Sequence, residues 1–411
     1  MLGLQLMNPF LQSTVGAPAL ELNFAKTKSL DPRITFSRAS EATYFGADGL
    51  LKTAAVDGPC FDHDPITLEC KGLAIWESRT NMLTYSEQFD NAAWGKAFLT
   101  LTPNATTAPD GTTTADRLTR TGNATYSQAL TKAASPMTYT GSVFVKGDTP
   151  AHYLTIDDGT ATNRAIVILD LVTGLLISTN TEGNFTFAAS TVQKVAHDFY
   201  RITLTVITNS TTSVRFRAYF GSGTYADVWG AQLEVGAFPS PYIPTVASAV
   251  TRAADIAQMT GSNFSDWYRQ DEGSFVCKFD TNTSGIGYPV IFRADNGTTQ
   301  NAISFVFNAT VSVYFNCVNG GTPQASLGNN IFLVSPGVSN IISGAYKLND
   351  FGASYNGSVS LSDNLGTPPM VSNFTIGHKY DSSVSINGHI AHLAYYPLRL
   401  SNTELQALSQ Q

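Results

Sequence analysis

The chain has 411 residues, a net charge of −7 and only 13% charged residues, against the roughly 25% that is usual for soluble domains. It has no run of Lys and Arg, which argues against nucleic-acid binding through phosphate neutralisation, and no apolar stretch approaches the ~20 residues of a membrane span. Thr, Ser, Asn and Gly fill the polar positions. This composition is typical of extracellular or virion proteins made mostly of sheet, and the length allows two or three domains.

Residues 1–24 have neither a helical nor a strand period, and Pro9, Gly16 and Pro18 interrupt them. We interpret this segment as an irregular docking arm, and the alternative is a frayed terminus. It lacks the basic region of a signal peptide, so we expect none. An extracellular-looking chain without a signal peptide fits a protein that is assembled inside a cell and released by lysis.

Residues 25–80 contain several short strand-like runs and a tight turn at 47–49. This small β-rich region is too short for a large core, so we expect it to pack against a neighbouring domain or another copy of the chain. Cys60 and Cys70 flank a segment in which Asp64-Pro65 can turn a hairpin, so the two thiols could face each other across strands. The alternative is two buried free thiols. No CxxC occurs, so a zinc site is not expected.

Residues 81–246 contain about ten short β runs separated by turn residues, with almost no helical period. Such spacing predicts a β-sandwich or jelly roll. Its last strand, near 227–235, is followed by a segment that Pro239, Pro241 and Pro244 interrupt. Between these prolines, Tyr242 and Ile243 are predicted to close the first domain like a clasp and to fix the direction in which the second leaves.

Residues 247–411 repeat this pattern and predict a second sandwich. The single helical candidate is the C-terminal SNTELQALSQQ, which Ser401 and Glu404 can begin with a capping box, with Leu405 and Leu408 on one face. The predicted fold class is therefore all-β, with two jelly-roll-like β-sandwich domains in tandem after a small β-rich N-terminal anchoring region.

Metal sites have little support in the sequence. Asp62-His63-Asp64 could hold a metal only if a turn brought alternate faces together, and a structural hairpin is the alternative. His389 and His392 are three apart, which converges on a helix but not on the strand expected there. The turns at 157–159 and 295–297 could bind structural Ca²⁺, or be plain turns. We expect no cofactor.

Catalytic motifs are missing from the sequence: no GxSxG, HExxH or P-loop pattern occurs. Glycoside hydrolysis would need two carboxylates roughly 5 to 9.5 Å apart, and the scattered Asp and Glu residues indicate no such pair. The repeat period of a long parallel β-helix is also missing. We therefore expect a protein that is not an enzyme.

Sugar binding is the chemistry that the aromatic residues favour. A sugar ring has an apolar face that stacks on flat aromatic rings, while its hydroxyls pair with polar side chains. Trp229 is assigned to the core because it lies in phase with Leu233. The candidate carbohydrate-binding residues are Tyr153, Tyr219 and Tyr225 in the first sandwich, and Trp267, Tyr268 and Tyr288 in the second.

Six segments of the chain are distinctive: RITFSRASEATYF, FDHDP, RTNMLTYSEQFDNAAW, APDGTTTADRLTR, FYRITLTV and WGAQLEVGAFPSPYIPT. They resemble segments of bacteriophage and prophage virion fibre or spike proteins. The central part is similar to a carbohydrate-binding-module-like sandwich, and the part from TRAADIAQMTGSNFSDWY onward is similar to concanavalin-A/laminin-G-like jelly rolls. One departure is AHDFYR, where a glycine-containing turn and a Trp before Tyr-Arg are expected, and Phe199 takes the aromatic position.

This resemblance implies a virion protein that is assembled in the host cytoplasm and released by lysis. Residues 1–80 would anchor it to other virion proteins (portal, neck, tail or capsid) and drive assembly of a homotrimer. The two sandwiches, 81–246 and 247–411, would project outward and contact host cell-surface glycans, with no nucleic-acid partner and no insertion into a membrane. The alternative is a purely structural head-decoration or neck fibre that binds no ligand.

Overall fold

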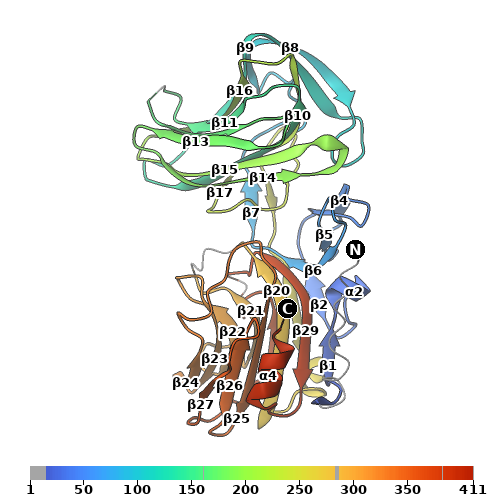
Figure 1. The fold of residues 1–411 in the computed structure, drawn as a ribbon, viewed down its shortest axis with the longest axis vertical. Helices are drawn as coiled ribbons and strands as arrows, with labels where there is room; N and C mark the ends of the chain where they lie inside the picture. Colours follow the sequence, from blue (N-terminus) through green and yellow to red (C-terminus); the bar gives the residue numbers. More distant parts are fainter. Residues whose placement is uncertain (1–14, 161, 283–286, 382, 411) are drawn as a thin grey trace.

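A computed structural model describes residues 15–160, 162–282, 287–381 and 383–410. The all-β fold class is confirmed: the chain forms antiparallel sheets with a few short helices. Two sandwiches are stacked along the long axis of the molecule, and the N-terminal strands lie beside the C-terminal sandwich (Figure 1). Within the described ranges, no helix is long and apolar enough to cross a membrane.

The first sandwich is one strongly bent sheet whose two halves face each other. Among the described residues its strand order is β13-β12-β11-β16-β9-β17-β10-β15-β14, with β8 paired to β9. Side chains that alternate between the two faces of each strand form its core. In β16, for example, Val214, Phe216 and Ala218 point inward and are fully buried. The strands are β8 Gly95–Thr106, β9 Ala115–Thr131, β10 Thr138–Gly147, β11 His152–Asp157, β12 Arg164–Leu169, β13 Leu176–Glu182, β14 Thr186–Lys194, β15 Tyr200–Ile207, β16 Ser213–Phe220 and β17 Tyr225–Val235.

The second sandwich has two sheets that enclose the largest hydrophobic core of the described residues. One sheet has the order β27-β26-β25-β20-β29-β6-β5, with β1 paired to β29, and the other has the order β2-β19-β28-β21-β22-β23-β24. The strands of the first sheet are β27 Leu361–Asp363, β26 Phe351–Tyr355, β25 Asn340–Lys347, β20 Glu272–Thr281, β29 Gly388–Tyr396, β6 Cys70–Ile75, β5 Phe61–His63 and β1 Leu20–Leu22. Those of the second are β2 Thr35–Ser37, β19 Ile256–Thr260, β28 Asn373–Ile376, β21 Val290–Asp295, β22 Ala302–Phe307, β23 Val313–Asn319 and β24 Thr322–Leu327.

Four short elements complete the fold. Helices α2 Phe24–Thr27 and α3 Ser262–Ser265 are single turns, and η1 Ala196–Asp198 precedes β15. The C-terminal helix α4 Asn402–Leu408 is confirmed with its capping box, in which the Ser401 hydroxyl accepts from the Glu404 amide and the Glu404 carboxylate accepts from the Ser401 amide. Leu405 anchors α4 because its side chain is fully buried beside β25 and β26.

The N-terminal segments do not form sheets of their own apart from the hairpin of β3 Ala42–Phe45 and β4 Leu51–Ala54. Strand β6 pairs with β29, β5 pairs with β6, and β2 pairs with β19, so the predicted separate region 25–80 supplies strands to both sheets of the C-terminal sandwich. The predicted docking arm 1–24 needs the same correction from Val15 onward, because Leu20, Leu22 and Phe24 are buried in that core. Residues 1–14 lie outside the described residues. Local alternation predicts a strand but not its partner, which explains both differences.

The cysteines of the N-terminal region are free thiols, as are Cys277 and Cys317. Cys70 lies opposite His63 in the β5–β6 pair, and Cys60 precedes that ladder, so the two do not face each other. Burial raises the pKa of the Cys60 thiol to about 12, and the Arg38 guanidinium lies 3.7 Å from its sulfur. Cys60 is therefore a neutral buried thiol. The alternative of free thiols is confirmed, but of the two only Cys60 is buried, whereas Cys70 is half-buried.

The predicted clasp after β17 is confirmed. Tyr242 is buried and packs against Phe144 and Trp229, with ring centroids 5.9 and 4.9 Å away. The Ile243 amide donates to the Gln232 side-chain carbonyl at 2.8 Å, and Asn81 donates to the Ile243 carbonyl at 2.8 Å. The returning chain is therefore fastened to the first sandwich by both ring packing and buried hydrogen bonds.

Two chain segments connect the sandwiches, and they pair with each other. Strand β7 Arg79–Asn81 runs up and β18 Val250–Arg252 runs down, as an antiparallel ladder between the two bodies (Figure 1). The hydroxyls of Thr80 and Thr251 are 2.8 Å apart across this ladder. A paired connection resists bending more than a single strand would, which limits the motion of one sandwich relative to the other.

At the lower end of this ladder, three charged side chains form the junction cluster: Arg38, Arg252 and Asp255. All three are buried. One Asp255 oxygen accepts from Arg38 at 3.1 Å, and the other accepts from Arg252 and, at 2.8 Å, from the Trp76 amide. One carboxylate thus balances two buried guanidiniums and joins the end of β6 to the start of β19.

We predict that Asp255→Asn destabilises the protein by about 3–5 kcal/mol, because it leaves two buried guanidiniums without a counter-charge. The control is Asp271→Asn, which removes an exposed partner of Arg269 and should leave the stability almost unchanged. Urea denaturation of both variants gives the comparison. Equal and small losses would show that the junction cluster does not hold the sandwiches.

Candidate functional site

The candidate site is the face of strands β12, β11 and β16 that points away from the core of the first sandwich, and its side chains are half-buried or buried. Leu154 and Ile156 of β11 point into the core, so Tyr153, Thr155 and Asp157 point to the other side of the sheet. The cross-strand register places these three between partners on both neighbouring strands, which gives three rows. We call these nine residues the tyrosine face: Ile168, Tyr153 and Tyr219 in the first row; Ile166, Thr155 and Arg217 in the second; Arg164, Asp157 and Arg215 in the third.

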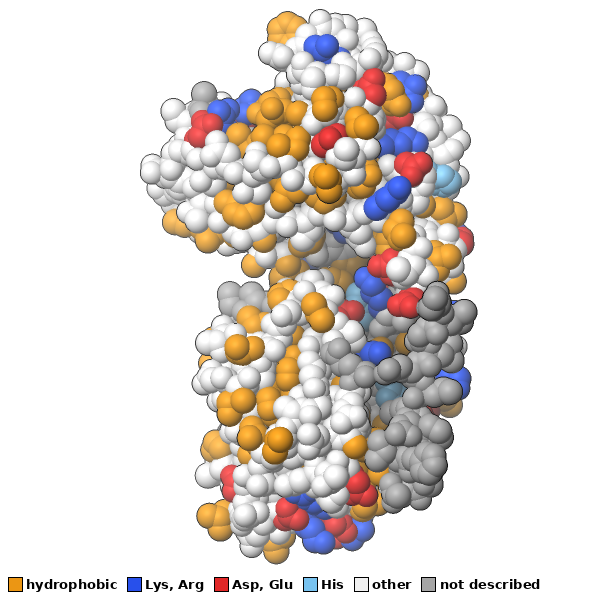
Figure 2. Space-filling model, in the orientation of Figure 1, with side chains coloured by type: hydrophobic (Ala, Val, Ile, Leu, Met, Phe, Trp, Pro, Cys, Tyr) orange, Lys and Arg blue, Asp and Glu red, His pale blue; other side chains and the backbone are white. Residues whose placement is uncertain are grey.

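The first row carries the aromatic surface. The rings of Tyr153 and Tyr219 stack with centroids 4.3 Å apart and an interplanar angle of 12°. Both side chains are half-buried, and neither hydroxyl has a hydrogen-bond partner among the described residues. Figure 2 shows hydrophobic side chains gathered over β11 and β16, with charged side chains at the margin. The pair therefore offers a fixed apolar ridge that ends in two available hydroxyls.

The third row carries the charges. Asp157 is fully buried beneath Arg215 and Arg217, whose Nε atoms lie 2.7 and 3.0 Å from its two oxygens. Arg164 donates to Glu182 at the outer edge, at 2.7 Å. The carboxylates hold the guanidiniums in place, so the donors that remain are presented in fixed directions.

Several polar atoms of the tyrosine face are buried without a hydrogen-bond partner among the described residues. They are Thr155 Oγ1, Asp157 Oδ2, Arg164 Nε and Arg217 Nε. Asp157 Oδ2 and Arg217 Nε form an ion pair but are not aligned as a hydrogen bond. Buried polar groups are normally satisfied, so these atoms distinguish the tyrosine face from the regularly paired strands around it.

The other predicted sugar-binding residues do not join this face. Trp267 and Tyr268 are buried between the two sheets of the second sandwich, where both contact Tyr395, so their prediction as ligand residues is wrong. Tyr288 is 52% exposed but belongs to the other sandwich, before β21. Tyr225 lies under the Arg117 guanidinium, 4.1 Å from its ring centroid, in a separate cleft.

The polar members of the face were missed at the sequence level. The segment SVRFRAYF alternates, so Arg215, Arg217 and Tyr219 had to share one side of β16, and this signal was available. Asp157 forms the plain turn predicted as one alternative, because its carboxylate accepts from the Gly159 amide at 2.8 Å, and two arginines hold the same carboxylate. Trp229 was correctly assigned to the core, where it is 2% exposed.

The histidine clusters proposed as metal sites have other partners. Asp62 and Asp280 flank the buried His389 at 3.0 and 2.8 Å, whereas His63 points away and its Nδ1 lies 3.2 Å from the Phe45 carbonyl. Asp64 accepts from the amides of its own turn. The described residues hold no group of three or more His, Cys, Asp or Glu side chains placed to bind a metal ion.

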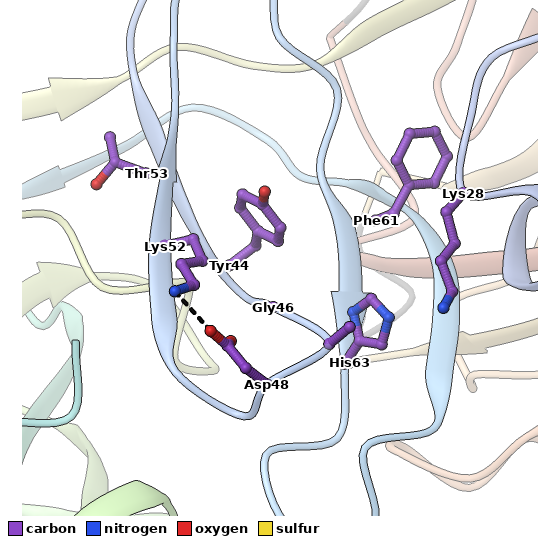
Figure 3. A pocket seen from close by; sticks show the side chains of 9 residues that line it. Lys28, Tyr44, Gly46, Asp48, Lys52, Thr53, Phe61 and His63 are labelled. Carbon is purple, nitrogen blue, oxygen red and sulfur yellow. Dashed lines mark ion pairs between the residues drawn. The ribbon is translucent and has the colours of Figure 1, made fainter. Parts of the chain in front are cut away.

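A second hollow, of about 580 Å³, lies between the β3–β4 hairpin and β5. Figure 3 shows Tyr44, Asp48 and Lys52 on the hairpin side, with His63 and Phe61 opposite. The Lys52 ammonium and the Asp48 carboxylate form an ion pair at 2.7 Å. This mixed lining points to no single ligand chemistry, in contrast to the tyrosine face.

Comparison with known proteins gives similarity of fold alone. No protein-family model matches the chain, and no curated protein matches it. Among solved structures, the CBM40 of a Ruminococcus gnavus IT-sialidase bound to α2,3-sialyllactose is 16% identical, with 34% of this chain and 84% of that chain covered and a TM-score of 0.30. Domain 4 of AbnA, an extracellular GH43 arabinanase from Geobacillus stearothermophilus, in complex with arabinotriose, is 12% identical. The match covers 42% of this chain and 82% of that chain, with a TM-score of 0.30. Mouse laminin α1 domains LG4-5 are 9% identical, with 74% of this chain and 88% of that chain covered and a TM-score of 0.24.

The pKa of His389 provides a test of the Asp62–His389–Asp280 contact. Burial alone would lower this pKa, but Asp280 and Asp62 outweigh it and raise the pKa from 6.5 to about 9. The stabilising charge is therefore fully present below pH 6.5 and is lost as the pH rises through about 9. We predict that the stability difference between the wild type and His389→Gln, measured by urea unfolding, shrinks over this range. A difference independent of pH would contradict the charged assignment.

Proposed function

We propose that the chain is a glycan-binding protein and that the tyrosine face of the first sandwich is its binding site. The observation that carries the proposal is the juxtaposition of a stacked tyrosine pair with buried polar atoms that lack partners. Apolar contact and unsatisfied polar groups in one place are what a sugar ring requires, since it has an apolar face and a rim of hydroxyls.

Each row of the face would take a different part of the ligand. The ridge of Tyr153 and Tyr219 would contact the apolar side of a sugar, and their hydroxyls would exchange hydrogen bonds with it. Arg217 in the next row, whose side chain is partly exposed, would supply a donor to the sugar oxygens. All of these groups stand on paired strands rather than on loops, so little ordering would accompany binding.

We further propose that the glycan belongs to a host cell surface and that the chain is a fibre or spike protein of a bacteriophage virion. The support is the ordered resemblance of its segments, from RITFSRASEATYF to WGAQLEVGAFPSPYIPT, together with its low content of charged residues. A homotrimer anchored to portal, neck, tail or capsid proteins would present several faces at once, and multivalency would offset weak single sites.

Two other functions compete with this one. A head-decoration or neck fibre would use the same sandwiches as spacers and would bind no glycan. A glycan hydrolase would release reducing ends from host polysaccharide, whereas we propose binding without cleavage. Incubating the protein with the glycan that it binds and then assaying reducing ends distinguishes hydrolysis from binding without cleavage.

We predict that Tyr219→Ala weakens glycan binding by about tenfold or more, because truncating a central aromatic contact typically removes more than about 1 kcal/mol. Tyr219→Phe keeps the ring and should retain most of the affinity. The measurement is a glycan array with the full chain, followed by titration of the strongest ligand.

Tyr288→Ala is the matched control, since it removes a more exposed tyrosine from the other sandwich. Its binding should equal that of the wild type. Loss of binding in this variant with retention in Tyr219→Ala would move the site to the second sandwich. No binding by the wild type to any host glycan would favour the spacer function.

The virion proposal has a separate test in the N-terminal residues. Removing residues 1–24 would delete buried side chains such as Leu20 and Phe24 and damage the C-terminal sandwich. We therefore predict that removing residues 1–14 alone leaves glycan binding unchanged but abolishes incorporation into particles, as measured by immunoblotting of purified virions. Normal incorporation of the truncated protein would contradict an anchoring role for these residues.

A further inference from the structure

A cleft of about 380 Å³ opens on the first sandwich, on strands β9, β17, β10, β14 and β15 and the turn before β15. This volume lies within the range of small-molecule sites, about 300–1,000 Å³. The cleft and the tyrosine face share no residue. Its lining includes Arg117, Lys146, Lys194, His197, Tyr200 and Tyr225.

One cation in the lining of the cleft has no carboxylate partner among the described residues. Arg117 is paired with Asp227 through two hydrogen bonds of 2.7 and 2.9 Å, and Lys194 is paired with Asp198 at 3.0 Å. Lys146 forms no ion pair among the described residues; its ammonium donates to the Thr106 hydroxyl at 3.3 Å and to the His197 carbonyl at 3.2 Å.

Lys146 is held in place from below. Its ammonium lies 4.7 Å from the centroid of the Phe199 ring, which is fully buried. Burial lowers the pKa of Lys146, and the carboxylates of Asp227 and Asp198 partly oppose this effect. A half-buried ammonium with spare donor capacity and no paired carboxylate is a favourable partner for an anionic group.

The rim of the cleft has an unusual backbone. His197 and Asp198 both adopt left-handed conformations, with φ of 56° and 62°, at the turn where the resemblance implies glycine. Glycine adopts this conformation without the steric cost that other residues bear. The turn instead places two polar side chains at the rim, both exposed, and aims the His197 carbonyl at Lys146. Such outliers concentrate at functional sites.

The uncharged walls suit a sugar rather than a free anion. The lining is mostly polar, and Tyr200 and Val172 supply its small apolar part, with Val172 64% exposed. The Tyr225 ring is covered by the Arg117 guanidinium and so is fixed in position. A ring with one carboxylate would place its charge at Lys146 and its hydroxyls against Thr106 and Asp198.

We propose that this cleft is a second binding site, which takes a sugar unit carrying a single carboxylate, such as a uronic acid. The site is independent of the tyrosine face and does not require that face to bind a glycan. It would select acidic saccharides because Lys146 is the one uncompensated cation of the lining in the described structure, whereas a neutral sugar leaves that ammonium without a counter-charge.

The test uses the full chain with carbon-13-labelled histidine rings. The sequence contains six histidines, so the His197 signal can be assigned by its loss in His197→Gln. Glucuronate is titrated in, with glucose as the neutral counterpart. We expect glucuronate to shift the His197 signal saturably, glucose to leave it unmoved, and added salt to weaken the response.

Two lysine variants make the assignment specific. Lys146→Gln should weaken glucuronate binding about tenfold or more, as expected for loss of a charge-assisted hydrogen bond. Lys26→Gln removes an exposed lysine on α2, far from Lys146 in the sequence, and should leave the affinity for glucuronate unchanged. An equal response to glucose, an unchanged affinity in Lys146→Gln, or no response to glucuronate would overturn the proposal.

Tyr219→Ala separates this site from the tyrosine face. Glucuronate should still shift the His197 signal of that variant with unchanged affinity. If the response were lost, the cleft would not be an independent site and the inference would fail. If Tyr219→Ala left all glycan binding unchanged while glucuronate still shifted the His197 signal, the cleft would remain a binding site although the tyrosine face would not be one.

Discussion

The buried carboxylate of Asp255 is the contact on which the arrangement of the two sandwiches depends. It is the counter-charge of two buried guanidiniums at the point where both connecting strands reach the C-terminal sandwich. Transferring three charged groups out of water is costly, and only good geometry compensates for it. The cluster therefore tolerates few alternative positions of Arg38 and Arg252. Above it, the ladder of β7 and β18 and the clasp around Tyr242 carry this fixed geometry into the first sandwich, so the faces of that sandwich have a defined direction.

The same rule about buried polar groups has opposite outcomes in two parts of the first sandwich. In the clasp, the Gln232 amide and the Ser240 hydroxyl and amide all donate to the Glu234 carboxylate, which is 1% exposed. That network is satisfied, and it holds structure. On the tyrosine face, the Thr155 hydroxyl is also buried but has no hydrogen-bond partner among the described residues, and Arg217 Nε is ion-paired with Asp157 without an aligned hydrogen bond. Satisfied networks stabilise a fold, whereas unsatisfied ones at a surface favour a ligand.

The sequence predicted much of this architecture, because alternation and turn residues act locally. The strands of the first sandwich, the clasp and the Ser401–Glu404 capping box all follow from short-range patterns. The partners of β1, β2, β5 and β6 did not follow, because which sheet edge accepts a short strand is decided by contacts far away in the chain. The burial of Gln232 and Glu234 does not follow from the sequence pattern either, because only the folded clasp supplies their hydrogen-bond partners.

The candidate site was partly predictable for the same reason. Tyr153 and Tyr219 were both named as ligand candidates, but their stacking depends on the register of β11 against β16, which no local pattern contains. Trp267 and Tyr268 were named on composition, and the packing of two sheets buried them. Aromatic residues occur both in hydrophobic cores and in sugar-binding sites, so only their burial in the folded structure distinguishes the two roles.

The proposed binding mode requires direct contact between a sugar and the stacked tyrosine pair. The most direct measurement is an NMR experiment that detects magnetisation transfer between the ring protons of labelled tyrosines and the carbon-bound protons of a bound oligosaccharide. The chain has 17 tyrosines, and the signals of Tyr153 and Tyr219 can be assigned by substitution. We expect transfer from these two rings and none from Tyr288. Transfer confined to other tyrosines, with both of these rings silent, would contradict the account.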